Sequence, residues 1–209
     1  MKLKAATWSA KKASRRSVGK EKGMRFLDRL FREGKAETKE YSTGDVFGHL
    51  APKAEELLER ARRGGRISFA EYLPLMEMAE SHWLGAGRKD HSRAAAAYSI
   101  LIEIAPDDVQ RSAAHGCRGR QFEEMGAADR AIDDTTRAID LLKACGGGAF
   151  ERLAYALYEH LGRQNEKKGD LRGAITAYQE IPKAYPRYRS VAEKVRELEA
   201  RYHKARNSA

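Results

Sequence analysis

The chain has 209 residues, 42% of them hydrophobic and 33% charged, so it can fold around a core as one large or two small domains. No apolar run approaches the roughly 20 residues of a membrane-spanning helix, and no secretory signal pattern appears. Two isolated cysteines, Cys117 and Cys145, make no disulfide framework and have no metal-ligand spacing. They indicate a reducing compartment, which we expect to be the cytoplasm.

The net charge of +10 is unevenly distributed along the chain. Residues 1–66 hold 18 Lys/Arg against 9 Asp/Glu, whereas residues 67–209 hold 22 against 21. The first 20 residues contain seven basic side chains and no acidic one. This pattern predicts a basic N-terminal arm joined to a nearly neutral helical body. The arm, about 1–22, has no apolar periodicity and is expected to be disordered when free.

Three interpretations of the basic arm stay open. As a contact to nucleic acid or the ribosome, it would neutralise phosphates without reading sequence. As an organelle-targeting presequence it has a suitable acid-free composition, although its amphipathicity is poor. As a solvated tail it needs no role. Under the first interpretation, the side chains that contact phosphates would be Lys11, Lys12, Arg15, Arg16 and Lys20.

A short amphipathic helix is expected directly after the arm, over residues 24–32. Residues 35–49 are polar, contain two Gly and are interpreted as a linker. We therefore divide the chain into an N-terminal region, 1–50, and a helical domain, 51–209. Self-association through the apolar face of the short helix is one hypothesis for its role. That face consists of Met24, Leu27, Leu30 and Phe31.

The helical domain begins with a segment whose ends carry clear helix signals. Pro52 stands near a first turn and Gly64–Gly65 closes the run, with Glu early and Arg late. Ser68 and Glu71 have the spacing of a capping box for the next helix, in which Pro74 predicts a later start or a kink.

From residue 67 onward the pattern is one helix after another, with short loops and no convincing alternation at period two. The sequence therefore predicts an all-α fold of antiparallel helix pairs. The expected helices cover 69–86, 91–104, 109–124, 127–143, 149–167, 170–184 and 188–206.

Small, aromatic and proline residues recur in the second helix of each expected pair. Ala94 is followed by Tyr98 and Pro106, and Ala174 by Tyr178 and Pro186, at the same offsets. Ala131 begins a third run in the same frame, without the aromatic residue and the Pro. The small residue permits close helix approach, the aromatic ring fills the adjacent groove, and Pro ends the helix.

Glycines extend the same frame into the preceding helices. Gly119 precedes Gly126 by seven residues, and Gly126 precedes Ala131 by five. Gly162, Gly169 and Ala174 show the same two spacings. An internal repeat of helix pairs explains both sets, and the alternative is a plain helical bundle in which these spacings coincide.

The pattern resembles the tetratricopeptide repeat (TPR), whose signature is W-x2-L-G-x2-Y, then A-x3-F, then P. The resemblance covers about 75–188, with repeats over about 75–108, 112–145 and 155–188 and a capping helix over 188–206. It implies a short α-solenoid behind a partly disordered basic arm. In this sequence the repeats are 37 and 43 residues apart, whereas those of the family are roughly 34 residues apart. The extra residues predict a lengthened loop around 144–150. Pro182 predicts a distorted last turn in the helix over 170–184.

The resemblance also implies a function, because the first helices of such repeats line a concave groove that holds peptides or partner helices. The predicted function is a non-enzymatic adaptor that binds another protein or peptide, with association between copies through the solenoid ends as a further hypothesis. Simple solvation of the charged groove residues, and packing of the tryptophan against the preceding helix, are the alternatives. Mapping the inward positions gives Trp83, Arg120, Glu123, Glu124, Glu159, His160, Arg163 and Glu166.

Other chemistry finds little support in the sequence, and we expect no enzyme activity, cofactor or metal. Residues 65–76 resemble the second half of an EF-hand loop, but Arg60 and Arg62 would occupy oxygen-ligand positions and repel calcium. The histidines lack metal-binding spacing, and no Walker, GxGxxG or GxSxG motif occurs. The Lys and Asn residues with which one TPR subfamily clamps chaperone tails are also missing at the matching positions.

Overall fold

The structure is a computed structural model that describes residues 40–84, 89–146 and 148–207. The internal contacts of the chain divide it into residues 1–42 and 43–209, and the helices described below belong to the second unit. The expected helix over 24–32 and the basic arm, with its predicted phosphate contacts, lie outside the described residues. The residues concerned in the arm are Lys11, Lys12, Arg15, Arg16 and Lys20.

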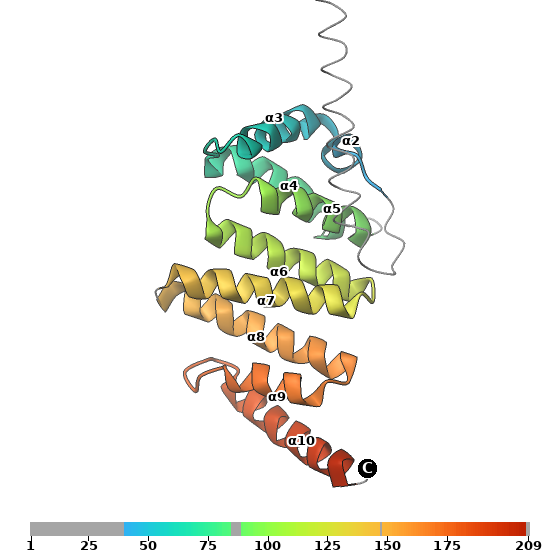
Figure 1. Cartoon of the computed structure of the whole chain (residues 1–209), viewed down its shortest axis with the longest axis vertical. Helices are drawn as coiled ribbons and strands as arrows, with labels where there is room; N and C mark the ends of the chain where they lie inside the picture. Colours follow the sequence, from blue (N-terminus) through green and yellow to red (C-terminus); the bar gives the residue numbers. More distant parts are fainter. Residues whose placement is uncertain (1–39, 85–88, 147, 208–209) are drawn as a thin grey trace, which may run out of the picture. The chain divides into compact units, whose positions relative to one another are not determined.

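The described part of the chain is helical and contains no strand, so the all-α prediction is confirmed. Consecutive helices pack on one another as adjacent pairs, as the side-by-side placement of α6, α7 and α8 shows (Figure 1). The elements are α2 (Thr43–Phe47), a 3-10 turn η1 (Gly48–Leu50), α3 (Ala51–Arg62), α4 (Phe69–Leu84), α5 (His91–Glu103), α6 (Asp108–Glu124), α7 (Ala128–Cys145), α8 (Gly148–Lys168), α9 (Leu171–Gln179) and α10 (Tyr188–Asn207).

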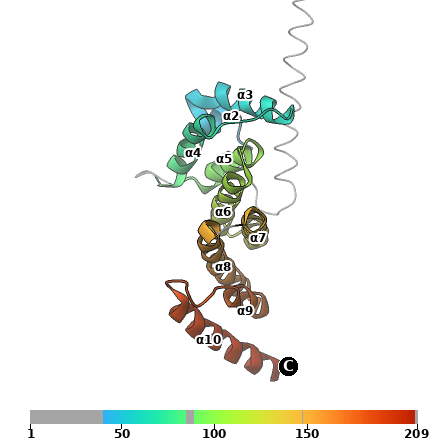
Figure 2. The same ribbon diagram turned by 90° about the vertical axis from the view of Figure 1, so that its left-hand side faces the viewer.

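The helices from α4 to α9 form two rows. Figure 2 shows α4, α6 and α8 in one row, called the first row here, and α5, α7 and α9 in the other, the second row. Each first-row helix packs on the second-row helix that follows it, which is the arrangement of a helical repeat. None of the described helices is both long and apolar enough to cross a bilayer.

Local signals position the helix ends as the sequence predicts. The backbone N–H of Ser68 donates to the carboxylate of Glu71 at 3.1 Å, and the N–H of Glu71 donates back to the Ser68 hydroxyl at 3.4 Å. This reciprocal pair is the expected capping box. Helix α4 begins at Phe69 and continues through Pro74, so the later start that Pro74 predicted is wrong. Asp90 and Asp170 cap α5 and α9 by accepting a backbone N–H three residues on, at 2.9 and 2.8 Å.

The turns after α6 and α8 are built in the same way, 43 residues apart. Gly126 donates its N–H to the carbonyl of Glu123 at 3.0 Å, and Gly169 donates to Glu166 at 3.0 Å. Both glycines have positive φ, 75° and 85°, a conformation that side chains disfavour. The shared glycine spacing in the sequence thus corresponds to a shared turn between paired helices.

The glycine seven residues before each turn glycine lies at the contact between the two paired helices. A β-carbon on Gly119 would lie 3.0 Å from the Thr135 hydroxyl, and one on Gly162 would lie 2.6 Å from the Tyr178 ring. Thr135 and Tyr178 are also 43 residues apart and hold the same place in α7 and α9. The absent side chain allows the two helices of each pair to approach closely.

The expected linker over 35–49 contains structure in its C-terminal part. Residues 43–50 form α2 and η1, and α2 contacts α3, α4 and α5. Val46 and Phe47 are almost fully buried, and the Val46 carbonyl oxygen lies 2.7 Å from the His82 imidazole Nε2. Packing of two apolar side chains therefore orders a segment whose composition is otherwise polar.

Two further expectations about helix ends are corrected. The lengthened loop around 144–150 is wrong, because α7 continues to Cys145 and α8 begins at Gly148. The extra residues lengthen the helices instead, and Gly146, with φ of 66°, ends α7. Helix α9 ends at Gln179 and does not reach 184. Pro182 has no N–H to donate and disfavours helical backbone at the residue before it, so the helix stops ahead of it.

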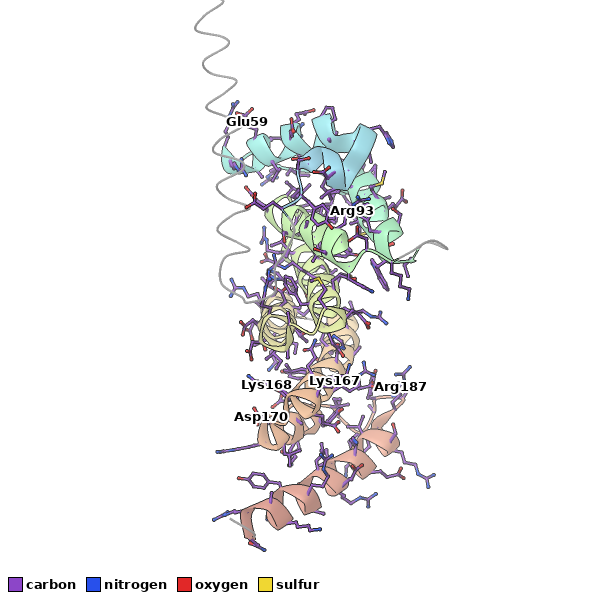
Figure 3. All side chains as sticks on the ribbon, turned by 90° about the vertical axis from the view of Figure 1, so that its right-hand side faces the viewer. Glu59, Arg93, Lys167, Lys168, Asp170 and Arg187 are labelled. Atoms are coloured by element: carbon purple, nitrogen blue, oxygen red, sulfur yellow. The ribbon has the colours of Figure 1, made fainter. Side chains whose placement is uncertain are left out.

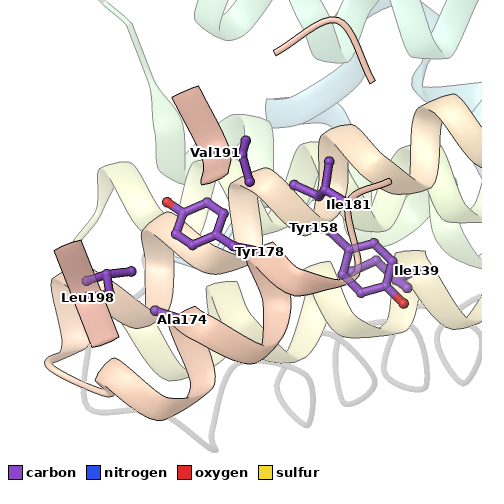
Figure 4. Close-up of a cluster of buried hydrophobic side chains, with 7 residues drawn as sticks. All are labelled: Ile139, Tyr158, Ala174, Tyr178, Ile181, Val191 and Leu198. Carbon is purple, nitrogen blue, oxygen red and sulfur yellow. The ribbon is translucent and has the colours of Figure 1, made fainter. Parts of the chain in front are cut away.

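The C-terminal half of the chain shares one apolar cluster that joins α7, α8, α9 and α10 (Figure 4). Helix α10 contributes Val191 and Leu198, which are 4% and 0% exposed. Its remaining surface is largely polar, as expected for a terminal helix that covers a repeat array. The buried members of the cluster are Ile139, Tyr158, Ala174, Tyr178, Ile181, Val191 and Leu198.

Candidate functional site

A cleft of about 630 Å³ lies between α6 and α8, two neighbours of the first row. The two helices run in the same direction, since Gly116 approaches Leu157 while Glu123, further along α6, reaches Lys167, further along α8. The N-terminal halves of both helices therefore line one end of the cleft, and their C-terminal halves line the other. The two ends differ in chemistry.

The first end of the cleft is apolar. It is lined by Val109 and Ala113 of α6 and by Leu153 and Leu157 of α8. Leu153 is 53% exposed, so about half of this aliphatic side chain is open to the cleft. A β-carbon on Gly116 would lie 3.1 Å from the Leu157 side chain, so the glycine lets α6 and α8 approach each other here.

The second end of the cleft is charged and centres on Glu123. This carboxylate pairs with the Lys167 ammonium and lies 3.1 Å from His160 Nε2. Figure 3 labels Lys167 together with its neighbour Lys168, which leaves α8 toward Asp129 of α7 at 2.6 Å instead. The two adjacent lysines of α8 thus pair with different helices, and of the two only Lys167 lines the cleft.

Burial and neighbouring charges shift two pKa values at this end of the cleft. Burial alone would raise the pKa of Glu123, but the hydrogen bond from Lys167 and the positive charge of that ammonium group lower this pKa. Burial lowers the pKa of His160; the negative charge of Glu123 opposes this, but the positive charges of Arg163, Arg120 and Lys167 add to the lowering. At neutral pH the imidazole is therefore uncharged, and Lys167 is the counter-charge of Glu123.

An aromatic side chain and a cysteine lie beside the charged end. Trp83 donates its indole N–H to the Tyr98 hydroxyl at 3.0 Å, which anchors it to the following helix, α5. The Arg120 guanidinium lies over the Trp83 ring, 5.1 Å from its centre. Cys117 also lines the cleft, but burial raises the pKa of its thiol, which disfavours the reactive thiolate.

Glu159 and Glu166, which the sequence places on the inner face of α8, do not line the cleft. Glu159 accepts a hydrogen bond from the Tyr185 hydroxyl at 3.2 Å and lies 3.4 Å from Arg187. Glu166 pairs with Lys194 of α10 at 3.0 Å. Both carboxylates therefore point from α8 toward the α10 side. The other six predicted positions line the cleft: Trp83, Arg120, Glu123, Glu124, His160 and Arg163.

The ion pair between Glu123 and Lys167 has an equivalent further along the chain. Glu166 follows Glu123 by 43 residues, and each pairs with a lysine two helices further along the chain, Lys167 in α8 and Lys194 in α10. Helix α10 thus stands beside α8 as α8 stands beside α6.

Sequence reasoning missed Lys167, Leu153 and Leu157 as cleft residues. Lys167 lies four residues after Arg163 and seven after His160, so helical spacing alone could have placed it on the same face. The leucines were assigned to no site, because an apolar residue on an amphipathic helix normally faces the core.

A second polar cluster, away from the cleft, joins α6 to α7. Asp134 is buried and accepts two hydrogen bonds from Arg118, both 2.7 Å, and lies 2.9 Å from His115 Nδ1. Burial would raise the pKa of Asp134, but Arg118 and His115 lower it overall. Arg118 also donates to the Ser99 hydroxyl at 3.0 Å. Charge-assisted hydrogen bonds of this cluster therefore link α6 to α7 and, through Ser99, to α5.

No protein-family model, no curated protein and no solved structure matches this sequence. Within residues 40–84, 89–146 and 148–207, no three His, Cys, Asp or Glu side chains gather as metal ligands.

Proposed function

We propose that this chain is a non-enzymatic, TPR-like adaptor that binds a segment of a partner protein in the cleft between α6 and α8. The observation that carries the proposal is the cleft itself, about 630 Å³ between parallel first-row helices, apolar at one end and charged at the other. Its volume lies in the range of small-molecule sites, roughly 300–1,000 Å³, and so leaves room for side chains of a partner segment.

The exposure of Leu153 supports binding of a protein segment. Full burial of an exposed side chain of this size gains about 1.5–3 kcal/mol, and a partner that covers the exposed 53% of Leu153 gains about half of that. The fixed ion pair at the other end, between Glu123 and Lys167, offers polar atoms that can orient the same partner. Nothing in this arrangement activates a nucleophile or a water molecule, which favours binding over catalysis.

The test is a selection of peptides from a displayed random library on the full chain, followed by affinity measurements on the enriched peptides. Leu153→Asp is expected to weaken their binding at least about tenfold, since a charge would face the apolar side chains of the peptide. Phe69→Asp is the matched control, because Phe69 is 47% exposed but lies outside the cleft. Equal affinity of both variants, or no enriched peptide at all, would contradict the proposal.

A second candidate function rests on the charge distribution. Residues 1–66 hold 18 Lys/Arg against 9 Asp/Glu, so the N-terminal region suits contacts to nucleic-acid phosphates. Binding of RNA and DNA, measured against salt with and without residues 1–22, tests this function. Affinity that depends neither on salt nor on these residues would contradict it.

A further inference from the structure

The charged end of the cleft carries cations that other charges of the cleft do not neutralise. Within the described residues, Arg120 is exposed and forms no ion pair, and its guanidinium rests on the Trp83 ring. Arg163 is 52% exposed and lies 3.5 Å from Glu159, a carboxylate that it shares with Arg187. These two arginines hold equivalent positions 43 residues apart, one on each wall of the cleft.

The balance of charge at this end is positive. Arg120, Arg163 and Lys167 line it together with only two carboxylates, Glu123 and Glu124. Lys167 is already paired with Glu123, and the imidazole between the walls is neutral. The lowered pKa of that imidazole is consistent with the same field, because all three cations act on it. An acidic group would therefore be attracted to the space between the two arginines.

We propose, on the basis of the adaptor function above, that the occupant of the cleft is an amphipathic protein segment of defined pattern. It places an aliphatic or aromatic side chain over Leu153 and Leu157, and the carboxylate of an internal Asp or Glu between Arg120 and Arg163. Apolar burial supplies affinity at the first end, and the carboxylate fixes the direction of the segment at the second.

The spacing of the two ends limits which segments fit. Leu157 and Arg163 are six residues apart on α8, which corresponds to about 9 Å along the helix axis. On a partner helix, positions i and i+7 lie on one face and are about 10 Å apart. A helical partner therefore needs its acidic residue about two turns from its apolar anchor.

The same arrangement disfavours a nucleic acid as the occupant. A phosphate backbone carries a charge at every nucleotide, and a strand lying along the cleft would meet Glu123 and Glu124 beside the arginines. Its other phosphates would lie over Leu153 and Leu157, where burial of a charge is costly. A protein segment with one carboxylate between the arginines and an apolar side chain over the leucines avoids both the repulsion and the burial of a charge.

The decisive experiment compares peptide selections on the full wild-type chain and on the Arg120→Glu/Arg163→Glu variant. The wild type is expected to enrich internal segments with Asp or Glu about seven residues from a Leu, Ile, Phe or Trp. The variant is expected to enrich Lys or Arg at that position and to bind the wild-type peptides at least about tenfold more weakly. Arg137→Glu/Arg172→Glu is the control, with the same charge change on exposed residues of α7 and α9.

Each other outcome overturns the inference in a distinguishable way. Enrichment of apolar peptides without an acidic preference, or the same preference in both variants, rejects the carboxylate and leaves the adaptor function standing. Enrichment that requires a free C-terminus, tested by a library with blocked ends, rejects an internal acid. No enrichment rejects the adaptor function as well. If the charge-reversed chain does not fold, Arg120→Gln/Arg163→Gln is expected to lose the acidic preference without acquiring a basic one.

Discussion

Gly162 of α8 lies directly against the aromatic ring of Tyr178 in α9, where a β-carbon would come within 2.6 Å of two ring carbons. The Tyr178 hydroxyl then reaches back to donate to Glu166 at 2.8 Å. Glycine at position 162 therefore sets how closely α8 and α9 approach, and the ring fills the space that a side chain would occupy.

Gly162→Ala is expected to destabilise the protein by about 1–3 kcal/mol, although Ala favours a helix by about 1 kcal/mol over Gly, because the ring must move. Urea unfolding measures the change. In a Tyr178→Val background, which removes the ring and keeps an apolar side chain, the same substitution should be neutral or stabilising. An equal cost in both backgrounds would show that the ring is not the reason for the glycine.

Asp134→Asn is expected to lower the free energy of unfolding by about 3–5 kcal/mol, because it leaves the Arg118 charge in a buried place without its partner. The side chains of Asp134 and Arg118 are only 7% and 13% exposed. Asp133→Asn is the matched control, since Asp133 is exposed on the same helix and should change stability by no more than about 0.5 kcal/mol. Similar costs for both substitutions would remove the buried ion pair as an explanation.

Leu198→Ala is expected to cost about 2–5 kcal/mol, since Leu198 is fully buried in the cluster that joins α10 to α9. The measurement is thermal and urea unfolding of the full chain. Glu197→Ala, one residue earlier and 55% exposed at its side chain, should leave stability nearly unchanged. If the two variants unfold alike, α10 does not pack as described.

His160 makes stability fall as pH falls below about 6.5. Its pKa in the folded chain is below the ordinary 6.5, so the unfolded chain takes up a proton at a pH where the folded chain does not. This contribution is fully present above pH 6.5 and is lost as the pH falls through the folded pKa. The free energy of unfolding of His160→Gln should therefore depend less steeply on pH than that of the wild type.

Chemical denaturation at a series of pH values between about 8 and 5 measures this difference. Subtracting the variant curve from the wild-type curve cancels the other histidines, which both proteins share. Parallel curves would mean that the pKa of His160 is the same in the folded and the unfolded chain, which contradicts the lowered value.

Helix positions were largely predictable because their signals are local. The capping pair of Ser68 and Glu71 and the positive-φ glycines Gly126 and Gly169 act within one turn of the chain, so they are readable without neighbours. Helix α2 was not predictable in this way. Val46 and Phe47 form a helical turn only because α3, α4 and α5 supply a surface on which to bury them.

The candidate site was predictable only as a helix face. Spacing along α8 placed Glu159, His160, Arg163 and Glu166 on inward positions, but it could not tell which neighbouring helix each side chain would meet. In the folded chain Glu159 and Glu166 turn toward the α10 side, while His160 and Arg163 turn toward α6.

By itself the sequence determined the all-α class, the paired helices and the 43-residue correspondence between glycines, because these follow from local backbone chemistry and from small residues at regular spacing. Only the tertiary structure decided which charges pair, that Leu153 stays exposed and that the cleft lies between α6 and α8. Those features depend on distances between helices far apart along the chain, which helical periodicity does not contain.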